Sequence, residues 1–508
     1  MGQRGTTAWW GELMAKFVLA IDQGTTGTTA LVFDQAGALR GRAYGAIRQS
    51  YPRPGWVEHD PEELYRSVLR TGKAALRAAR VGERELAAIG LTNQRETFVV
   101  WERATAQPVH PAIVWQCRRS SEICRTLRER EDEISRRTGL LADPYFAGTK
   151  LKWLLDQKSH LRRRAARNQL CFGTIDTWIL FKLTRGRTFV TDYTNASRTM
   201  LMNLETREWD PAMLEMLDVP WEMLPGLVAS RGPIAEAPRG TFASHPVAIG
   251  ALIGDQQSAL FGQGCTRLGE AKVTYGTGAF LLVNTGAVRP YSQHRLIATA
   301  ALGNSGQSAF ALEGAVFIAG AAIQWLRDEL GLISEAAETD ALARQSADRL
   351  RPWVVPAFVG LGAPYWDSEA RGAILDLTRG TTRADLVRAT LDSIAYQVGD
   401  VLAAMEQDTR KPIRALRVDG GAAANDYLMQ FQADLIGRTI VRPLMAETTA
   451  LGAALLAGLA VGVWRSADQM LESRMVDRRF RPTMKSPDRK RLRAGWRAAV
   501  RRVLTTGA

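Results

Sequence analysis

The sequence predicts a mixed α/β protein built from two related domains. Three observations support this: a length of 508 residues, an opening series of strands followed by a helix, and a strand–turn–strand motif that occurs twice. Single hydrophobic cores rarely extend over a chain of this length, which favours at least two domains. We expect a first domain over residues 16–263 and a second over residues 264–508.

The composition is typical of a folded protein, with 46% hydrophobic and 23% charged residues. The net charge of +14 comes mostly from arginines scattered through helical segments, and no clustered aromatic and basic motif accompanies it. The densest basic stretch, residues 477–502, carries Leu492, Trp496, Ala499 and Val500 at helical spacing. This predicts a docked helix with a solvated basic face, the alternative being a nucleic-acid or membrane surface. We expect no nucleic-acid partner.

The four cysteines are too sparse and too irregularly spaced for a disulfide framework or a zinc site. This favours a reducing compartment, and we expect a cytoplasmic protein. The longest apolar run, residues 450–464, is shorter than a bilayer span and contains three glycines, so it predicts a buried helix and no membrane span. Residues 1–15 show no signal-peptide pattern, and we expect them to be an N-terminal extension.

The first copy of the repeated motif is FVLAIDQGTTGTTALVF, residues 17–33. An apolar run ends at Asp22, a turn rich in glycine and threonine follows, and a second apolar run leads away. Glycines leave backbone amides unobstructed, and threonine hydroxyls can donate to phosphate oxygens. Asp22 could hold a hydrated Mg²⁺ beside the phosphates. The motif therefore indicates one half of a phosphate clamp, although a simple tight turn is the alternative.

The following segments predict a mixed sheet covered by helices. Residues 38–48 form a third strand candidate. A helix should then begin at Pro61, with Asp60 as its N-cap and Glu63 completing a capping box. LAAIGLTNQRETFVVW, residues 86–101, contains two strand candidates separated by a polar interruption.

The second copy of the motif, AKVTYGTGAFLLVNTG, occupies residues 271–286 and turns at Gly276-Thr277-Gly278. Its recurrence predicts two related domains. A third glycine turn follows a strand over residues 415–418, and a helix should begin near Asn425. The exposed amide end of that helix would suit an adenosine and its α-phosphate. The chain has no Walker-type motif.

Several polar residues follow apolar runs and would together suit a small polyol. Arg95 can donate hydrogen bonds, Glu96 and Asp255 can accept them, and Tyr145 can do either. Trp115 could cover a carbon chain. Taken singly, the two aromatic residues would more often be core or rim residues, and the Arg95-Glu96 pair would be a surface ion pair.

Many motifs in order resemble the glycerol kinases of the FGGY carbohydrate kinase family. The resemblance runs from Lys16 to about Val500. The motifs that carry it include DQGTTGTT, GWVEHDP, GLTNQRET, WQCRR, DPYFAGTKLKWLLD, TDYTNASRTML, GDQQSALFGQ, TYGTGAFLLVNTG and RVDGGAAANDYLMQFQAD.

The resemblance implies two ribonuclease H-like domains, as in actin and Hsp70, with the active site in the cleft between them. It implies ATP-dependent phosphorylation of glycerol to sn-glycerol 3-phosphate, with ATP and Mg²⁺ as cofactors and Asp255 as general base. The implied glycerol-binding residues are Arg95, Glu96, Trp115, Tyr145, Asp255 and Gln256. The implied nucleotide-binding residues are Thr25, Thr26, Gly27, Thr277, Gly320, Gln324, Gly421 and Asn425, and Asp22 would organise the metal.

One departure from the family pattern lies in the first turn. The family usually has an arginine directed to the phosphates where this chain has Thr29. A missing cation beside the transferring phosphoryl group could cost about 10² to 10³ in turnover if nothing replaces it. Two alternatives stay open. One is a kinase for another polyol or a pentulose, which would share the nucleotide-binding half. The other is a nucleotide-dependent actin-like binding protein, with phosphoryl transfer impaired because Thr29 replaces the expected arginine. We also expect a homo-oligomer, either a dimer or a tetramer.

Overall fold

The computed structural model describes residues 16–346, 351–367, 369–467 and 476–505. The expected N-terminal extension, residues 1–15, lies outside the described residues. The described chain forms two compact units. Unit 1 comprises residues 16–258, 304–307 and 449–467, and unit 2 comprises residues 259–303, 308–346, 351–367, 369–448 and 476–505.

The main sheet of unit 1 has six strands in the order β13-β14-β5-β1-β2-β3. Their bounds are β1 (Phe17–Gln23), β2 (Gly27–Asp34), β3 (Leu39–Ala46), β5 (Leu86–Asn93), β13 (Arg231–Ala237) and β14 (Val247–Gly254). The central strands β14, β5 and β1 run parallel to one another, and the remaining neighbours are antiparallel. The carboxyl ends of three adjacent strands therefore meet at one edge. The predicted first hairpin is confirmed as β1 and β2.

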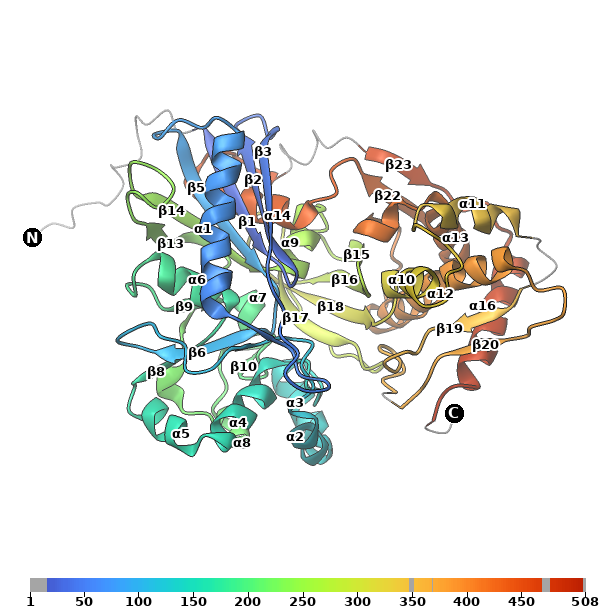
Figure 1. Cartoon of the computed structure of the whole chain (residues 1–508), viewed down its shortest axis with the longest axis horizontal. Coiled ribbons are helices and arrows are strands. Elements are labelled where there is room, and N and C mark those ends of the chain that lie inside the picture. Colours follow the sequence, from blue (N-terminus) through green and yellow to red (C-terminus); the bar gives the residue numbers. More distant parts are fainter. Residues whose placement is uncertain (1–15, 347–350, 368, 468–475, 506–508) are drawn as a thin grey trace, which may run out of the picture. The chain divides into compact units, whose positions relative to one another are not determined.

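Helix α1 (Pro61–Ala78) covers one face of this sheet and packs mainly on β2 and β3 (Figure 1). Asp60 is its N-cap, as predicted, and its carboxylate accepts the Glu62 N–H at 2.9 Å. The predicted capping box is wrong: the Glu63 carboxylate instead accepts the Arg48 N–H at 3.3 Å. A contact with the segment that follows β3 thus replaces the expected contact between Glu63 and the N-cap backbone.

Helix α14 (Thr448–Val461) contacts β5 and β14 through glycines. A Cβ on Gly90 would lie 2.2 Å from the Ala453 carbonyl oxygen, and one on Gly250 would lie 2.9 Å from that of Ala457. Within the helix, a Cβ on Gly452 would lie 2.0 Å from the Ser258 carbonyl oxygen. These positions need glycine because backbones approach each other closely there. The apolar run that predicted a buried helix is therefore part of unit 1.

The remaining elements of unit 1 surround a four-stranded sheet in the order β4-β7-β6-β8. Its strands are β4 (Glu58–His59), β6 (Phe98–Glu102), β7 (Ala112–Ile113) and β8 (Leu170–Thr174). The short strands are β9 (Val190–Asp192), β10 (Met202–Asn203), β11 (Glu208–Trp209) and β12 (Gly226–Val228). The helices are α2 (Ser121–Thr126), η1 (Arg128–Arg130), α3 (Glu131–Thr138), α4 (Ala147–Gln157), α5 (Ser159–Ala166), α6 (Ile175–Leu183), α7 (Tyr193–Ala196), α8 (Pro211–Leu217) and η2 (Trp221–Met223).

Unit 2 contains a seven-stranded sheet in the order β17-β18-β16-β15-β21-β22-β23. Its strands are β15 (Ala271–Tyr275), β16 (Ala279–Gly286), β17 (Ile297–Leu302), β18 (Ser308–Val316), β21 (Ala415–Asp419), β22 (Thr439–Pro443) and β23 (Val476–Phe480). Strands β15 and β16 form an antiparallel hairpin, and β15 also pairs in parallel with β21. Unit 1 uses the same arrangement for β1, β2 and β5. The predicted second copy of the hairpin is confirmed.

The other described elements complete the two units. Helix α9 (Asp255–Gly262) follows β14 directly. The remaining elements of unit 2 are α10 (Gly320–Asp328), α11 (Glu338–Gln345), β19 (Trp353–Val355), β20 (Ala373–Leu375), α12 (Arg383–Thr409), η3 (Gly421–Ala424), α13 (Asp426–Ile436) and α16 (Ser486–Arg501). In the described part of the chain, no helix combines the length and apolar character needed to cross a bilayer.

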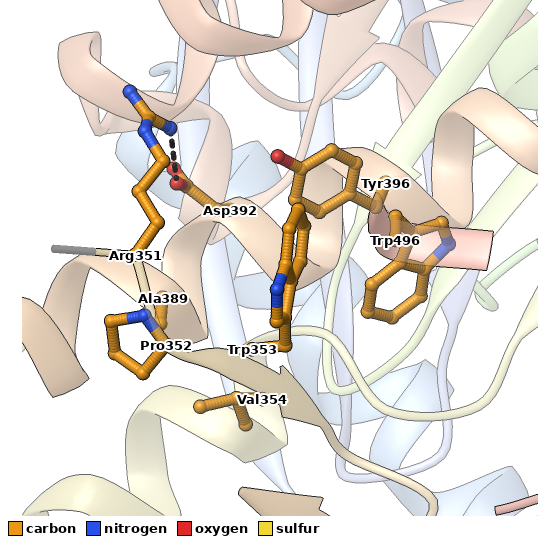
Figure 2. Close-up of a pocket in the computed structure, with 8 residues that line it drawn as sticks. All are labelled: Arg351, Pro352, Trp353, Val354, Ala389, Asp392, Tyr396 and Trp496. Carbon is orange, nitrogen blue, oxygen red and sulfur yellow. Dashed lines mark hydrogen bonds and ion pairs between the residues drawn. The ribbon is translucent and has the colours of Figure 1, made fainter. Parts of the chain in front are cut away.

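The basic C-terminal stretch begins with strand β23 and continues as helix α16, so the prediction of helix from residue 477 was wrong at its start. The predicted apolar face is confirmed, because Leu492, Trp496, Ala499 and Val500 are all buried. The Trp496 ring stacks on Tyr396 with ring centroids 5.1 Å apart beside a small cavity (Figure 2).

Candidate functional site

The candidate polyol site lies where β1, β5 and β14 of unit 1 end. Asp22 is the second-to-last residue of β1. Arg95 and Glu96 lie just after the end of β5, and Asp255 immediately follows β14. Parallel pairing sets Asp22 opposite Thr92. It likewise sets Gly254 opposite Asn93. Residues that are far apart in the sequence are thus brought together at one sheet edge, as expected for sites in parallel α/β sheets.

Arg95 is the centre of this cluster. Its buried guanidinium lies 3.1 Å from Asp255 Oδ1, and it donates to the Tyr145 hydroxyl at 3.4 Å and to Gln257 Oε1 at 3.2 Å. The Gln256 N–H donates to the same Asp255 oxygen at 2.6 Å. The structure therefore brings Arg95, Tyr145, Asp255 and Gln256 together, as predicted from the sequence.

Glu96 is buried and paired with a residue that the sequence did not single out. The Arg198 Nε donates to Glu96 Oε1 at 2.6 Å, whereas the Arg95 Nε lies 3.8 Å from the same oxygen. Glu96 also has a positive φ of 60°. A left-handed backbone at a non-glycine residue is strained, and such strain is concentrated at functional sites.

Trp115 and Tyr145 pack edge to face, with ring centroids 5.6 Å apart and an interplanar angle of 74°. A fully buried lysine contacts the backbone next to both rings. The Lys150 ammonium donates to the Tyr145 carbonyl oxygen at 2.8 Å and to that of Val114 at 3.5 Å. Burial lowers the pKa of Lys150 to about 7.

The first hairpin is connected to this cluster by direct hydrogen bonds. The Trp115 indole donates to the Thr25 hydroxyl at 2.9 Å. The Gln94 side chain donates to Gln23 Oε1 and to the Gly24 carbonyl oxygen, both at 3.2 Å. Thr25 at the turn and Trp115 in the polyol cluster therefore belong to one hydrogen-bonded assembly within unit 1.

The tip of the hairpin is covered by an aromatic ring on the next strand. A Cβ on Gly27 would lie 2.5 Å from the Tyr44 ring. The Tyr44 hydroxyl donates to the Thr26 carbonyl oxygen at 3.3 Å. A side chain at position 27 would therefore displace the exposed Tyr44 ring from the turn.

Asp22 has the features of a metal-binding carboxylate. Its Oδ1 is buried and has no hydrogen-bond partner among the described residues. Burial raises the pKa of Asp22 to about 7, with a further contribution from the negative charge of Asp255. Thr29 lies directly opposite Asp22 in the hairpin, so the two side chains share a face of the sheet. An arginine at position 29 would therefore have projected on the Asp22 side.

Unit 2 contains five of the predicted nucleotide-binding residues, and Gly320 packs directly against the turn that carries Thr277. The Gly320 N–H donates to the Gly276 carbonyl oxygen at 2.9 Å, and the Ala321 N–H donates to that of Thr277 at 3.0 Å. The start of α10 therefore lies against the turn that carries Thr277. A Cβ on Gly320 would lie 2.6 Å from the Gly276 carbonyl oxygen, so this approach requires glycine.

The third glycine turn also packs against this hairpin. A Cβ on Gly420, whose φ is 86°, would lie 2.4 Å from the Tyr275 carbonyl oxygen. The next residue, Gly421, has open space where its Cβ would be. Asn425 is the N-cap of α13, and its side chain accepts the Leu428 N–H at 2.8 Å. Gln324 is exposed on α10, away from the hydrogen bonds that join the helix to the turn.

Two buried residues that contact the cluster around Arg95 were not predicted from the sequence. Arg198 lies in the quoted motif TDYTNASRTML and Lys150 lies in DPYFAGTKLKWLLD, but neither received a role. A charged residue inside an apolar helical stretch, such as Lys150, is the signal that could have found it. The sequence offered no comparable signal for Arg198, because its partner Glu96 is distant in the chain.

Residues 17–262 match the N-terminal domain of the FGGY family of carbohydrate kinases, and residues 271–461 match its C-terminal domain. The chain belongs to this family. Among its relatives, glycerol kinase 2 of Pseudomonas aeruginosa is 52% identical over 489 residues, covering 96% of this chain and 97% of that protein. A glycerol kinase of Fusobacterium nucleatum is 50% identical over 490 residues, covering 96% and 99% of the two chains.

Solved structures of the FGGY family have the same two-domain α/β fold. The Plasmodium falciparum glycerol kinase with ADP has a TM-score of 0.89 at 33% identity and covers 96% of this chain and 98% of its own. A ligand-bound xylulose kinase from Lactobacillus acidophilus has a TM-score of 0.84 at 21% identity, covering 97% and 99%, which shows the shared fold alone. The fold class predicted from the resemblance is confirmed.

Proposed function

We propose that this protein phosphorylates glycerol at its 3-hydroxyl with ATP, releasing sn-glycerol 3-phosphate and ADP. The observation that carries the proposal is the cluster around Arg95, which joins Asp255, Tyr145 and Glu96 at one sheet edge. Relatives at about half identity over nearly the full chain are named glycerol kinase. A small polyol needs donors, acceptors and an apolar wall in one place, and these residues supply them.

In this proposal Asp255 is the general base. Arg95 and the Gln256 N–H both contact Asp255 Oδ1, so we assign the other carboxylate oxygen to the substrate hydroxyl. Arg95, Glu96, Tyr145 and Gln256 would bind the glycerol hydroxyls, and Trp115 would cover its carbons. Phosphoryl transfer depends mainly on positioning and charge stabilisation, so phosphate-binding turns, a metal ion and a base within reach of the hydroxyl are sufficient parts.

The residues also fit Mg²⁺. Asp22 Oδ1 is buried and unpartnered among the described residues, and no group of three acidic, histidine or cysteine side chains is found in the described part of the chain. Mg²⁺ usually keeps several waters and takes only one or two protein carboxylates beside substrate phosphates. Bound there, the ion would neutralise charge on the phosphates during transfer.

We assign nucleotide binding to the residues that the family resemblance implies. Thr25, Thr26 and Gly27 would bind phosphates in unit 1, and Thr277 would do so in unit 2. Gly320, Gln324, Gly421 and Asn425 would surround the base and ribose. Open space beside the α-carbon of Gly421 supports a close approach of a ligand there.

We further propose that the enzyme acts in the cytoplasm as a homo-oligomer, either a dimer or a tetramer. All four cysteines are buried free thiols, which suits a reducing compartment. Light scattering of the purified protein at several concentrations would measure its mass in solution. A mass of about 56 kDa at every concentration would contradict the oligomer.

The deciding experiment measures ADP formation with Mg²⁺ and ATP, with and without glycerol, beside dihydroxyacetone and a pentulose. We expect ADP to form quickly only with glycerol. Asp255→Asn should lower kcat at least about 100-fold while calorimetry shows unchanged ATP binding. Asp132→Asn, which alters an exposed carboxylate on α3, is the control.

Equal ADP release with and without glycerol would contradict the kinase assignment. It would favour a nucleotide-dependent binding protein, the second candidate, for which Thr29 in place of the expected arginine is the supporting observation. Faster turnover of a pentulose than of glycerol would instead favour a different substrate within the same family.

A further inference from the structure

Residues 192–198 form a segment that is buried except at the half-buried Tyr193. This segment, here called the bridge segment, contacts the ends of two neighbouring strands of unit 1. It includes the last residue of β9 and the whole of α7. One of its contacts goes to the end of β14 and others go to the end of β5 and to the residues that follow it. These are the strand ends that carry the proposed catalytic base and the proposed polyol-binding pair.

The contact with β14 is made by a buried threonine. The Gly254 N–H donates to the Thr194 hydroxyl oxygen at 2.8 Å. Gly254 immediately precedes Asp255, so this bond fixes the backbone at the residue from which the proposed base projects. The Thr194 hydroxyl itself donates to Asp192 Oδ2 at 2.6 Å, which leaves its oxygen to accept from Gly254.

The contact with β5 is a reciprocal pair of amides. Asn93 Nδ2 donates to Asn195 Oδ1 at 3.0 Å, and Asn195 Nδ2 donates to Asn93 Oδ1 at 3.1 Å. Asn93 Nδ2 also donates to the Gln94 carbonyl oxygen at 2.9 Å. The pair therefore fixes the backbone that leads directly into Arg95 and Glu96.

One buried carboxylate orients both side chains. Asp192 accepts from the Thr194 and Asn195 N–H groups at 2.8 and 3.1 Å, from Asn195 Nδ2 at 2.8 Å and from the Ser230 hydroxyl at 2.6 Å. With the Thr194 hydroxyl bond, five donors hold this carboxylate in place. Networks of this kind fix a unique geometry because each buried polar atom would be costly to leave unpaired.

We infer that Thr194 and Asn195, oriented by Asp192, are positioning residues that fix Asp255 relative to Arg95 and Glu96 for phosphoryl transfer. This inference rests on the proposed function. The base and the hydroxyl-binding pair project from different strands, and the bridge segment is bonded to both. Displacement of a reacting group by about 1 Å can lower a rate about 100-fold, so the bridge should affect kcat more than the binding of ATP.

The test compares two substitutions at position 194 with a matched control. Thr194→Val keeps the shape but removes the acceptor for Gly254, whereas Thr194→Ser keeps the hydroxyl. The control is Thr184→Val. The buried Thr184 hydroxyl likewise accepts a backbone N–H, from Thr188 at 3.2 Å, but Thr184 lies at the end of α6. For each protein, kcat, the KM values for glycerol and ATP, and the melting temperature are measured.

We expect Thr194→Val to lower kcat about 10- to 100-fold with the KM for ATP unchanged within about twofold. Thr194→Ser should recover at least about a third of the wild-type kcat. Thr184→Val should lose melting temperature but keep kcat near the wild-type value. If Thr194→Val lowers kcat no more than Thr184→Val, the positioning role is wrong while an active wild type leaves the proposed function standing.

A double-mutant cycle on Asn93 and Asn195 keeps the inference testable if Thr194→Val does not fold. Each alanine substitution should lower kcat, and the double substitution should lower it little further, because either single change already breaks the amide pair. Additive effects on kcat would overturn the inference. A wild-type protein that forms no ADP in response to glycerol would overturn the proposed function and the inference together.

Discussion

The Trp115 indole nitrogen donates a hydrogen bond to the Thr25 hydroxyl at 2.9 Å. The first residue belongs to the proposed glycerol site and the second to the proposed phosphate-binding turn. A single bond therefore connects the acceptor side of the reaction with the donor side inside unit 1.

Trp115→Phe should keep the aromatic surface over glycerol and lose the bond to Thr25. Because a hydrogen bond of this kind contributes about 0.5 to 1.5 kcal/mol, kcat/KM for ATP should fall about two- to tenfold. Steady-state kinetics with each substrate varied in turn will measure the change. Trp209→Phe is the matched control, since the buried Trp209 indole also donates one bond, to the Pro225 carbonyl oxygen at 2.8 Å. Equal losses in the two variants would contradict the prediction.

Thr29→Arg should raise kcat by about tenfold or more, because it places a cation on the Asp22 face of the first hairpin, where phosphates are proposed to bind. Thr29→Met supplies similar length without charge and should not raise kcat. The rate of ADP formation at saturating glycerol and ATP is the measurement. An unchanged rate in Thr29→Arg would show that other groups already supply the missing charge.

Arg198→Met should destabilise unit 1 by about 3 to 5 kcal/mol, because it leaves the buried Glu96 carboxylate without the partner at 2.6 Å. Denaturant unfolding will measure the loss. Adding Glu96→Gln to this variant should restore part of the stability, since the buried carboxylate that lost its Arg198 partner is then replaced by a neutral amide. The KM for glycerol should be raised in this double variant, because a proposed glycerol-binding carboxylate is removed. Full stability in Arg198→Met alone would rule out this role for the ion pair.

Asp176 in α6 should make the protein less stable as pH rises from about 4 to about 7. It is buried and accepts from the Thr174 and Thr191 hydroxyls at 2.5 and 2.7 Å. Burial, with the nearby charge of Asp192, raises the pKa of Asp176 to about 7, against about 4 in the unfolded chain. Between these values the folded state binds more protons than the unfolded state, so stability falls with rising pH and levels off above about 7.

Asp176→Asn should therefore reduce the fall in stability between pH 5 and pH 8, by about 1 to 3 kcal/mol. Melting temperatures at both pH values will measure this for the wild type, for Asp176→Asn and for the exposed-site control Asp132→Asn. An identical pH dependence in all three proteins would contradict the assigned pKa.

The sequence predicted features that depend on neighbouring residues. The two hairpins, the N-cap Asp60 and the buried helix that begins at Thr448 all follow from local patterns of glycine, polar caps and apolar runs. The predicted Glu63 capping box failed because the Arg48 N–H, two residues beyond the end of β3, competed for the same carboxylate. Local chemistry alone could not rank these two partners.

The sequence predicted the candidate site residues that would bind substrate or act as a base. It missed the buried residues that hold them in place. Arg95 and Asp255 follow apolar runs and are recognisable in the sequence, and the structure brings them within 3.1 Å. Arg198, Thr194 and Asn195 bond to partners 60 to 102 residues away in the sequence, and only the fold reveals which residues they meet. The resemblance covered these residues without assigning them a role.

The glycines that seat α14 on β5 and β14 have a consequence for how the protein is made. Unit 1 begins at the start of the described chain, yet one of its packing helices ends at Val461. Synthesis proceeds at about 5 to 20 residues per second. Until α14 leaves the ribosome, the sheet face at Gly90 and Gly250 has no helix packed on it. The first unit to be translated is therefore completed only after most of the second unit has emerged, so its apolar face is available to chaperones for tens of seconds.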